Sequence, residues 1–262
     1  SESYHVYDNL KQRFPAVRES NWGRLKTYVE FIADSAETYN KLLTRNQLNS
    51  IHERKVVERI FYQASTSSVI PILLAVYAKI KSSNERLEVI SLVEKLNFRF
   101  YGCGITKRSD TGNGHLFWLA HHFFNRFGNE GIDTHWLKSE LIRFVERECG
   151  DEIFIKALTL DKDESGGFYD WNNLKYFLAN YEEWIAVQNG ESEDFTRFLM
   201  PQQNEMKNAN FEKEHILAVN ECSVIAEPDA VSKRRLGNFV LLTPSVNKSI
   251  QDAPIYEKLI EY

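Results

Sequence analysis

The chain has 262 residues, of which 43% are hydrophobic and 26% charged, an ordinary balance for a globular protein with a buried core. No apolar run approaches the roughly 18 residues that a membrane-spanning helix needs. The first residues also lack the basic and apolar regions of a secretory signal. These features argue against a membrane or secreted protein and predict a cytoplasmic chain of one large or two smaller domains.

The first 190 residues or so carry the spacing of helices. Apolar positions recur at helical intervals over 20–43, and further helices are predicted at 56–62, 72–80, 87–98, 114–127, 134–148 and 171–185. The last of these is the clearest, because one stripe holds Trp171, Leu174, Leu178, Tyr181 and Ile185. Such a stripe favours core packing over stacking with nucleic-acid bases.

The sequence changes character after this region. Residues 188–210 are polar and aperiodic, which predicts a connector. Strands are then predicted at 211–219 and 238–242, and Pro244 and Ser245 open a helix. Strand, long loop, strand and helix is the order of a ββα-metal finger. The predicted fold class is therefore mainly α, with a multi-helix domain at 1–190 and a small ββα domain at 191–262.

Three residues of the second region could support phosphodiester hydrolysis. His215 has an imidazole that accepts a proton near neutral pH. Asn247, in the first turn of a helix, offers a neutral oxygen to a hard cation such as Mg²⁺. Asn238 follows Gly237 at a turn. Each residue alone is more often structural, but their order on strand, strand and helix favours a metal-dependent nuclease site.

Charge and cysteine content restrict the partners. The net charge of −5 is unusual for a DNA-binding protein, which normally contacts phosphates through lysine and arginine. One tight basic cluster, Lys233-Arg234-Arg235, lies between His215 and Asn238, and this position favours phosphate contact over a solvated loop. The cysteines are odd in number and far apart, which predicts neither a zinc pair nor a disulfide framework. They are Cys103, Cys149 and Cys222.

Two segments carry a resemblance to a known family. Phe-Glu-Lys-Glu-His-Ile-Leu-Ala-Val-Asn at 211–220 and Arg-Leu-Gly-Asn-Phe-Val-Leu-Leu-Thr-Pro-Ser-Val-Asn-Lys-Ser at 235–249 resemble the HNH (His-Me finger) nuclease domain. The resemblance is to the C-terminal region of bacterial GmrSD-type restriction proteins, including the phosphorothioate-sensing SspE-like group. The helical part of those proteins is similar to this chain at 98–101, 108–112, 169–171, 175–178 and 181–182.

The resemblance implies an endonuclease that cuts foreign, often modified, DNA in a restriction or phage-defence system. His215 would be the general base, Glu214 and Asn247 would bind Mg²⁺ or Mn²⁺, and Asn238 would brace the loop and the histidine. The cations expected to hold the DNA backbone are Lys233, Arg234, Arg235 and Lys248. Family members usually carry a nucleotide-binding N-terminal module, of which no motif is visible here, so a fragment trimmed at both ends is expected.

Two residue patterns depart from this assignment. Many relatives have a proline soon after the His-Ile pair, where this chain has Ala218-Val219-Asn220. Neighbours on a regular strand also face opposite sides, so Glu214 and His215 converge only if the strand ends or bulges there. In a straight strand, Glu212 shares the face of Glu214. A second hypothesis therefore stands beside the first, namely a non-catalytic helical module that binds DNA or protein in a defence complex.

Two further signals have ordinary explanations. Residues 161–166 resemble the start of a calcium loop, but Asn172 occupies the position that needs a bidentate glutamate, so an acidic turn is expected. His115, His121 and His122 lack the i, i+4 spacing of a helical zinc pair. They are expected to be core or surface residues.

Overall fold

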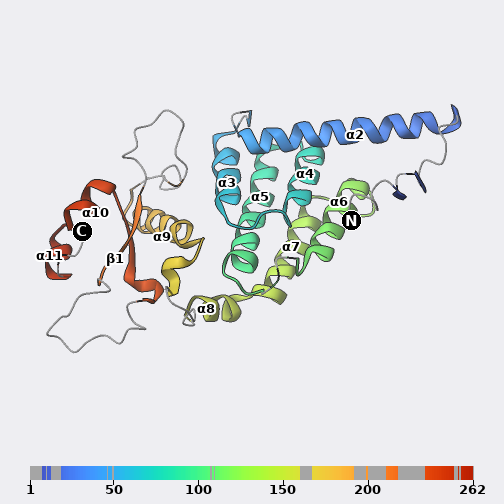
Figure 1. Ribbon diagram of the computed structural model, residues 1–262. Helices are drawn as coiled ribbons and strands as arrows, with labels where there is room; N and C mark the ends of the chain where they lie inside the picture. The colour runs from blue at the N-terminus through green and yellow to red at the C-terminus, as the bar shows by residue number, and fades with distance from the viewer. Residues whose placement is uncertain are drawn as a thin grey trace. The chain divides into compact units, whose positions relative to one another are not determined.

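The structure is a computed structural model, shown in Figure 1. It describes residues 8–9, 11–12, 19–45, 47–48, 50–106, 108, 110–159, 167–191, 199, 211–217, 234–250, 253 and 255–261. Helices account for most of these residues, which confirms the predicted mainly α fold class. Within these ranges, no helix combines the length and apolar character required to cross a membrane.

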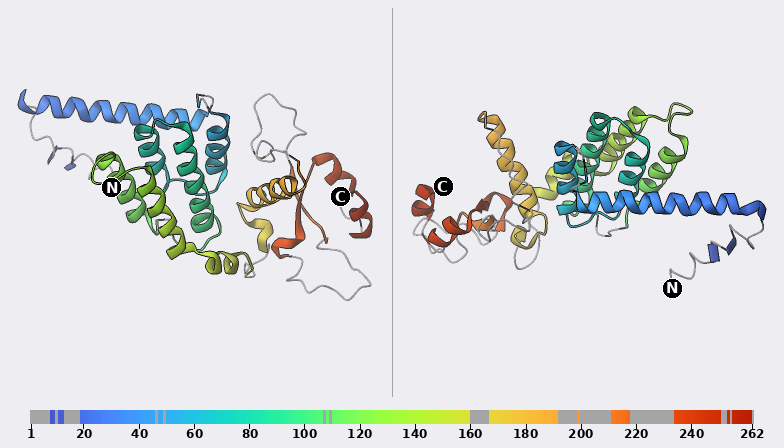
Figure 2. Two further views of the ribbon diagram at one scale, coloured as in Figure 1. Left: turned by 180° about the vertical axis from the view of Figure 1, so that it is seen from behind. Right: turned by 90° about the horizontal axis from the view of Figure 1, so that it is seen from above.

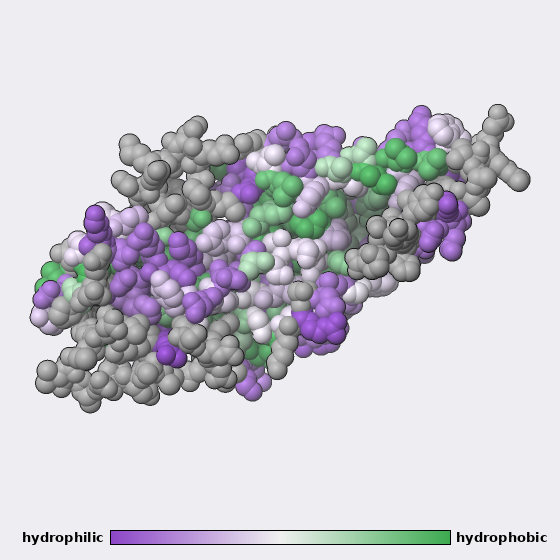
Figure 3. All heavy atoms as spheres, viewed as in Figure 1, coloured by the Kyte–Doolittle hydropathy of each residue, from purple (hydrophilic) through white to green (hydrophobic). Residues whose placement is uncertain are grey.

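The chain divides into two compact units, Ser1–Leu48 and Asn49–Tyr262. The first unit is dominated by α2 (Glu19–Thr44), which matches the helix predicted at 20–43. Apolar side chains of this helix, among them Val29 and Ile32, are exposed. Figure 3 shows green, apolar surface along this helix beside purple, hydrophilic surface.

The second unit begins with a helical array. Its elements are α3 (Ile51–Tyr62), α4 (Ile70–Lys79), α5 (Ser83–Asn97), the π-helical turn η1 (Phe98–Gly102), α6 (Asn113–Arg126), α7 (Thr134–Cys149), α8 (Asp151–Thr159), the 3-10 turn η2 (Gly167–Asp170) and α9 (Leu174–Gln188). Helix α5 packs against α3 and α7, and α4 packs against α6. The helices predicted from apolar spacing at 56–62, 72–80, 87–98, 114–127 and 134–148 all lie within or overlap these elements.

Side-chain caps explain where several helices begin. Ser50, Ser82 and Asp133 have extended backbones, and each side chain accepts a hydrogen bond from a backbone N–H in the first turn of α3, α5 or α7. The shortest of these bonds joins Asp133 Oδ1 to the N–H of Trp136 at 2.8 Å. A cap of this kind satisfies one of the backbone donors that a helix start leaves unpaired.

Replacement of Asp133 by alanine is expected to lower the free energy of unfolding by about 0.5–2 kcal/mol. The N–H of Trp136 would lose its acceptor, whereas Asp133→Asn retains an acceptor oxygen and should cost less. Urea denaturation followed by circular dichroism measures both changes. Equal destabilisation by the two variants would contradict a capping role.

A buried carboxylate ties three helices together. Glu53 on α3 is 1% exposed and accepts hydrogen bonds from Tyr77 of α4 and from Ser83 and Arg86 of α5. The Arg86 guanidinium also donates to the carbonyl oxygens of Ile80 and Lys81 at the α4–α5 connection. The charge is therefore paired and its lone pairs are occupied, which is the condition for burying a carboxylate.

The C-terminal elements are β1 (Glu212–His215), the 3-10 turn η5 (Leu236–Asn238), β2 (Phe239–Leu242), α10 (Pro244–Ile250) and α11 (Ile255–Glu261). The strands form a two-stranded antiparallel ribbon in which Glu212 pairs with Leu242 and His215 with Phe239. Within the described residues 211–217, the first strand covers only Glu212–His215 of the predicted 211–219. The helix predicted after Pro244 is present as α10.

One apolar core joins the ribbon to the helices. Phe239 and Leu241 of β2 belong to the same buried cluster as Leu174 and Leu178 of α9 and Phe98 of η1. The carbonyl oxygen of Gly102 accepts hydrogen bonds from Trp171 Nε1, a residue of this cluster, at 2.7 Å and from Asn173 Nδ2 at 3.1 Å. This core therefore joins α9, which precedes residue 190, to β2, which follows it. A domain boundary was predicted at residue 190.

The aromatic stripe of α9 is buried only over its first part. Trp171, Leu174 and Leu178 are at most 9% exposed, as predicted for core residues, but Tyr181 is 49% exposed. The prediction that the whole stripe faces the core is therefore wrong at Tyr181. The reason is tertiary: in the right-hand view of Figure 2, the C-terminal part of this gold-coloured helix extends clear of the neighbouring helices.

Candidate functional site

The ribbon has two faces of different character. On β1, Lys213 and His215 point to the face that carries Phe239 and Leu241, since paired residues of a ladder share a face. Glu212 and Glu214 point to the other face, toward α10 and α11. All four residues of β1 are in regular register with β2, so no bulge interrupts the alternation.

The His215 imidazole is packed between aromatic rings. It stacks on Tyr169 of η2, with ring centroids 5.1 Å apart and an interplanar angle of 16°, and its centroid lies 4.7 Å from that of Phe239. Burial holds the pKa of His215 below its ordinary value of 6.5; the nearby Lys258 and Lys213 ammonium groups also lower it, and the Glu214 carboxylate opposes them. The imidazole is therefore predominantly neutral at pH 7, as a general base must be.

Asn238 holds the chain that follows His215. Its side-chain Oδ1 accepts from the N–H of Leu217 at 2.8 Å, and its Nδ2 donates to the carbonyl oxygen of Leu217 at 3.0 Å. Its own carbonyl oxygen accepts from the N–H of Ile216 at 2.9 Å. The Asn238 carboxamide thus pairs with both the N–H and the carbonyl oxygen of Leu217. These two bonds fix the direction of the backbone just after β1 ends.

The opposite face of the ribbon gathers two carboxylates, an amide and a lysine. Asn247 Nδ2 donates to Glu212 Oε2 at 2.6 Å. Lys258 of α11 is fully buried, and its Nζ donates to Glu214 Oε1 at 2.8 Å and to the carbonyl oxygen of His215 at 3.0 Å. Glu214 is therefore committed to an ion pair, whereas Glu212 is exposed beside Asn247.

The donor set fits a hard divalent cation only in part. Oδ1 of Asn247 is buried and has no hydrogen-bond partner among the residues that the structure describes, which leaves an acceptor available beside the Glu212 carboxylate. A cation on Glu214 would instead be repelled by the Lys258 ammonium. No cluster of three or more His, Cys, Asp or Glu suited to a metal occurs within the described ranges.

The structure brings some predicted site residues together and separates others. Asn238 lies beside the segment that follows His215, and Glu214 shares a ribbon face with Asn247. His215 and Asn247 do not meet, because the imidazole packs on the Phe239 side and Asn247 contacts Glu212 on the other. Among the predicted phosphate-binding cations, Arg234, Arg235 and Lys248 are exposed, and Lys233 lies outside the described residues.

Three residues of this region make contacts that the sequence did not predict. Lys258 neutralises Glu214, Tyr169 packs on His215, and Glu212 contacts Asn247. Lys258 carried a weak signal, since it lies between apolar residues of a short helix (Ile-Tyr-Glu-Lys-Leu-Ile at 255–260). Nothing in the sequence around Tyr169 indicates a contact with the histidine.

His115 and His122 of α6 lie beside aromatic rings. His115 stacks on Phe144 and His122 on Trp118, with centroids 5.5 and 4.8 Å apart, so both are part of aromatic packing. The acidic segment at 161–166 and Cys222 lie outside the described residues. Cys103 and Cys149 are buried.

Comparisons with protein-family models, with curated proteins and with solved structures find no match to this chain.

Proposed function

We propose that this protein is a metal-dependent DNA endonuclease of the HNH type, acting in restriction or phage defence. The observation that carries the proposal is the pair of Asn238 side-chain hydrogen bonds that holds Leu217, two residues after a histidine kept neutral by burial. The family resemblance assigns this bracing role to the same asparagine. A ribbon followed by a helix that bears Asn247 agrees with the expected order of elements.

In the proposed reaction, His215 takes a proton from the water that attacks the scissile phosphorus. The exposed cations Arg234, Arg235 and Lys248 would contact the DNA backbone. Asn247 and Glu212 would hold Mg²⁺ or Mn²⁺, in place of the Glu214–Asn247 pair that the resemblance implies. The ion, when bound, would neutralise negative charge that develops at the phosphate.

A second function is favoured by one specific observation. Because His215 and Asn247 lie on different faces of the ribbon, hydrolysis requires the end of β1 to turn so that the imidazole leaves Tyr169. A non-catalytic module that binds DNA or protein in a defence complex requires no such movement. Cleavage assays separate the two functions.

Incubation with supercoiled plasmid in the presence of Mg²⁺ is expected to yield nicked or linear DNA, and chelation with EDTA should abolish the products. Glu212→Gln is expected to raise the Mg²⁺ concentration needed for half-maximal cutting, because it removes the carboxylate beside Asn247. Gel electrophoresis over a Mg²⁺ titration measures both effects. Intact plasmid with either Mg²⁺ or Mn²⁺, whether modified or unmodified, would rule out the nuclease in favour of the binding module.

A further inference from the structure

Helix α9 carries a ladder of aromatic rings that runs from the core to the surface. Phe177 and Tyr181 have centroids 6.4 Å apart and an interplanar angle of 5°, and Tyr181 and Trp184 have centroids 6.1 Å apart at 20°. Tyr181 is 49% and Trp184 58% exposed. At the inner end, Phe177 stacks on Phe98 at 6.5 Å. Parallel rings left open to solvent mark a binding surface rather than a core.

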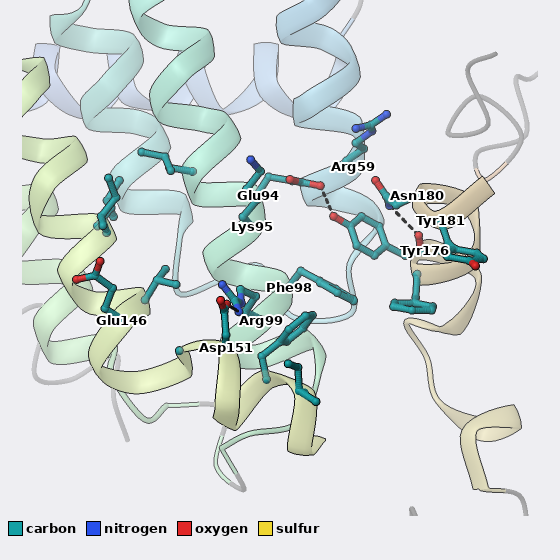
Figure 4. Close-up of a pocket in the computed structure, with 18 residues that line it drawn as sticks. Arg59, Glu94, Lys95, Phe98, Arg99, Glu146, Asp151, Tyr176, Asn180 and Tyr181 are labelled. Carbon is teal, nitrogen blue, oxygen red and sulfur yellow. Dashed lines mark hydrogen bonds and ion pairs between the residues drawn. The ribbon is translucent and has the colours of Figure 1, made fainter. Parts of the chain in front are cut away.

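A large cleft lies along one side of this ladder. It has a volume of about 1120 Å³, slightly above the usual size range of small-molecule sites, and its walls are mainly apolar. Figure 4 shows the cleft residues Phe98, Tyr176 and Tyr181, which come from η1 and α9. The volume and the aromatic walls would accommodate planar, apolar rings.

Three cations line the same cleft. Arg59 is paired with Glu183, and Arg99 with Asp151, while Lys95 completes the set. The Nε atoms of Arg59 and Arg99 are buried without a hydrogen-bond partner in the described part of the chain, and only about a fifth of each side chain (20% and 22%) is exposed to a ligand.

Acidic residues line the cleft as well. Besides Asp151, the lining includes Glu94 and Glu146. Burial raises the pKa of Glu94, and the Tyr176 hydroxyl donates a hydrogen bond to it. The lining thus combines aromatic rings with guanidinium groups, and the buried Glu94 carboxyl is occupied by the Tyr176 hydroxyl.

The aromatic ladder also reaches the candidate site. Phe177 and Tyr181 line a second cleft of about 680 Å³, whose other wall contains Ile216, Arg235 and Gly237. Ile216 directly follows His215, and its N–H donates to the carbonyl oxygen of Asn238. The same two rings therefore border both clefts, and one of these clefts adjoins the segment that carries the proposed base.

We propose that the exposed aromatic face of α9 binds unpaired bases of a DNA strand, which stack on Tyr181 and Trp184 and lead that strand toward His215. Proteins that hold single strands combine aromatic platforms for the bases with cations for the backbone. Bases of an intact duplex are stacked on one another and cannot lie on these rings. The direction toward His215 rests on the proposed nuclease function, whereas strand binding does not.

The test measures binding with cleavage switched off. A short fluorescein-labelled oligothymidylate is titrated with the full chain in EDTA, and fluorescence anisotropy gives the Kd. Stacking contributes about 1–3 kcal/mol per base on alanine substitution, so the loss of two rings in Tyr181→Ala/Trp184→Ala is expected to weaken binding at least roughly 30-fold. Trp22→Ala, which removes a tryptophan of nearly equal exposure (59%) on α2, serves as the matched control and should leave the Kd unchanged.

Two further ligands identify the chemistry. An abasic strand of equal length keeps the phosphates and lacks the rings, so it should bind the wild-type chain as weakly as the double variant binds oligothymidylate. A blunt duplex should also bind weakly, and the double variant should not change its affinity. Circular dichroism checks that the variants are folded, which is expected because both rings are solvent-exposed.

Several results would overturn the proposal. Unchanged oligothymidylate affinity in the double variant would do so, as would equal losses with duplex and single strand. If the double variant alters only the sedimentation of the chain, the aromatic face is a protein interface instead. Because binding is measured in EDTA, absence of plasmid cutting together with ring-dependent strand binding would refute the nuclease and leave this inference standing.

Discussion

Alanine in place of His215 is expected to slow Mg²⁺-dependent plasmid cutting roughly 10²- to 10⁴-fold, the usual contribution of a positioned general base. The fold should persist, because the substitution removes a half-buried ring from the ribbon edge and leaves the Asn238 hydrogen bonds to Leu217 in place. Single-turnover assays at saturating protein measure the rate, and circular dichroism reports the fold.

A matched histidine elsewhere provides the control for that experiment. His122 is also stacked on an aromatic ring, that of Trp118, and lies on α6 among the helices. His122→Ala should therefore retain the wild-type cutting rate. Equal rates in His215→Ala and the wild type would assign the hydrolysis, if any is seen, to other residues.

The pH dependence follows from the direction of the His215 pKa shift. A base works in its unprotonated form, and burial holds the pKa of this imidazole below 6.5. The pH at which the cutting rate falls to half of its maximum should therefore lie below 6.5. A half-maximal rate at or above pH 7 would indicate a base with a higher pKa.

Replacement of Lys258 by methionine is expected to lower the free energy of unfolding by about 3–5 kcal/mol, because Glu214 would keep a largely buried charge without its partner. The carbonyl oxygen of His215 would lose a donor as well. Urea denaturation monitored by tryptophan fluorescence measures the loss. A methionine of similar length fills the space, so the effect reports the charge rather than a cavity.

The double variant Lys258→Met/Glu214→Gln also removes the unpaired charge of Glu214. It should recover at least about 1 kcal/mol of the free energy of unfolding that Lys258→Met loses. Lys248→Met, at an exposed lysine of α10, is the control and should shift stability by no more than about 0.5 kcal/mol. If Lys258→Met behaves like Lys248→Met, the ion pair does not stabilise this part of the fold.

Local patterns in the sequence predicted most helices, because apolar spacing acts within a few positions along the chain. They predicted less of the candidate site. The pairs Glu214–Lys258 and Glu212–Asn247 join residues 44 and 35 positions apart, so only tertiary packing decides them. Strand alternation predicted that, in a straight strand, Glu212 and Glu214 share one face and His215 lies on the other. The regular register of β1 fulfils this condition.

The exposure of Tyr181 and Trp184 could not be predicted for a related reason. Helical spacing identifies which residues share a stripe, but not how far along the helix a neighbour continues to cover it. Leu174 and Leu178 are covered by β2, while the rings one and two turns later have no such cover over much of their surface. The burial of an amphipathic helix therefore depends on the element that packs against it as well as on its own sequence.

The common core of α9 and β2 sets an order of folding during synthesis. The helices precede the strands along the polypeptide, so α9 emerges from the ribosome before Phe239 and Leu241 do. The ribbon can then fold onto an apolar surface of α9 that has already formed. The apolar face of β2 is therefore exposed to water only briefly. Released alone by a protease, the same ribbon would keep that face uncovered and should aggregate.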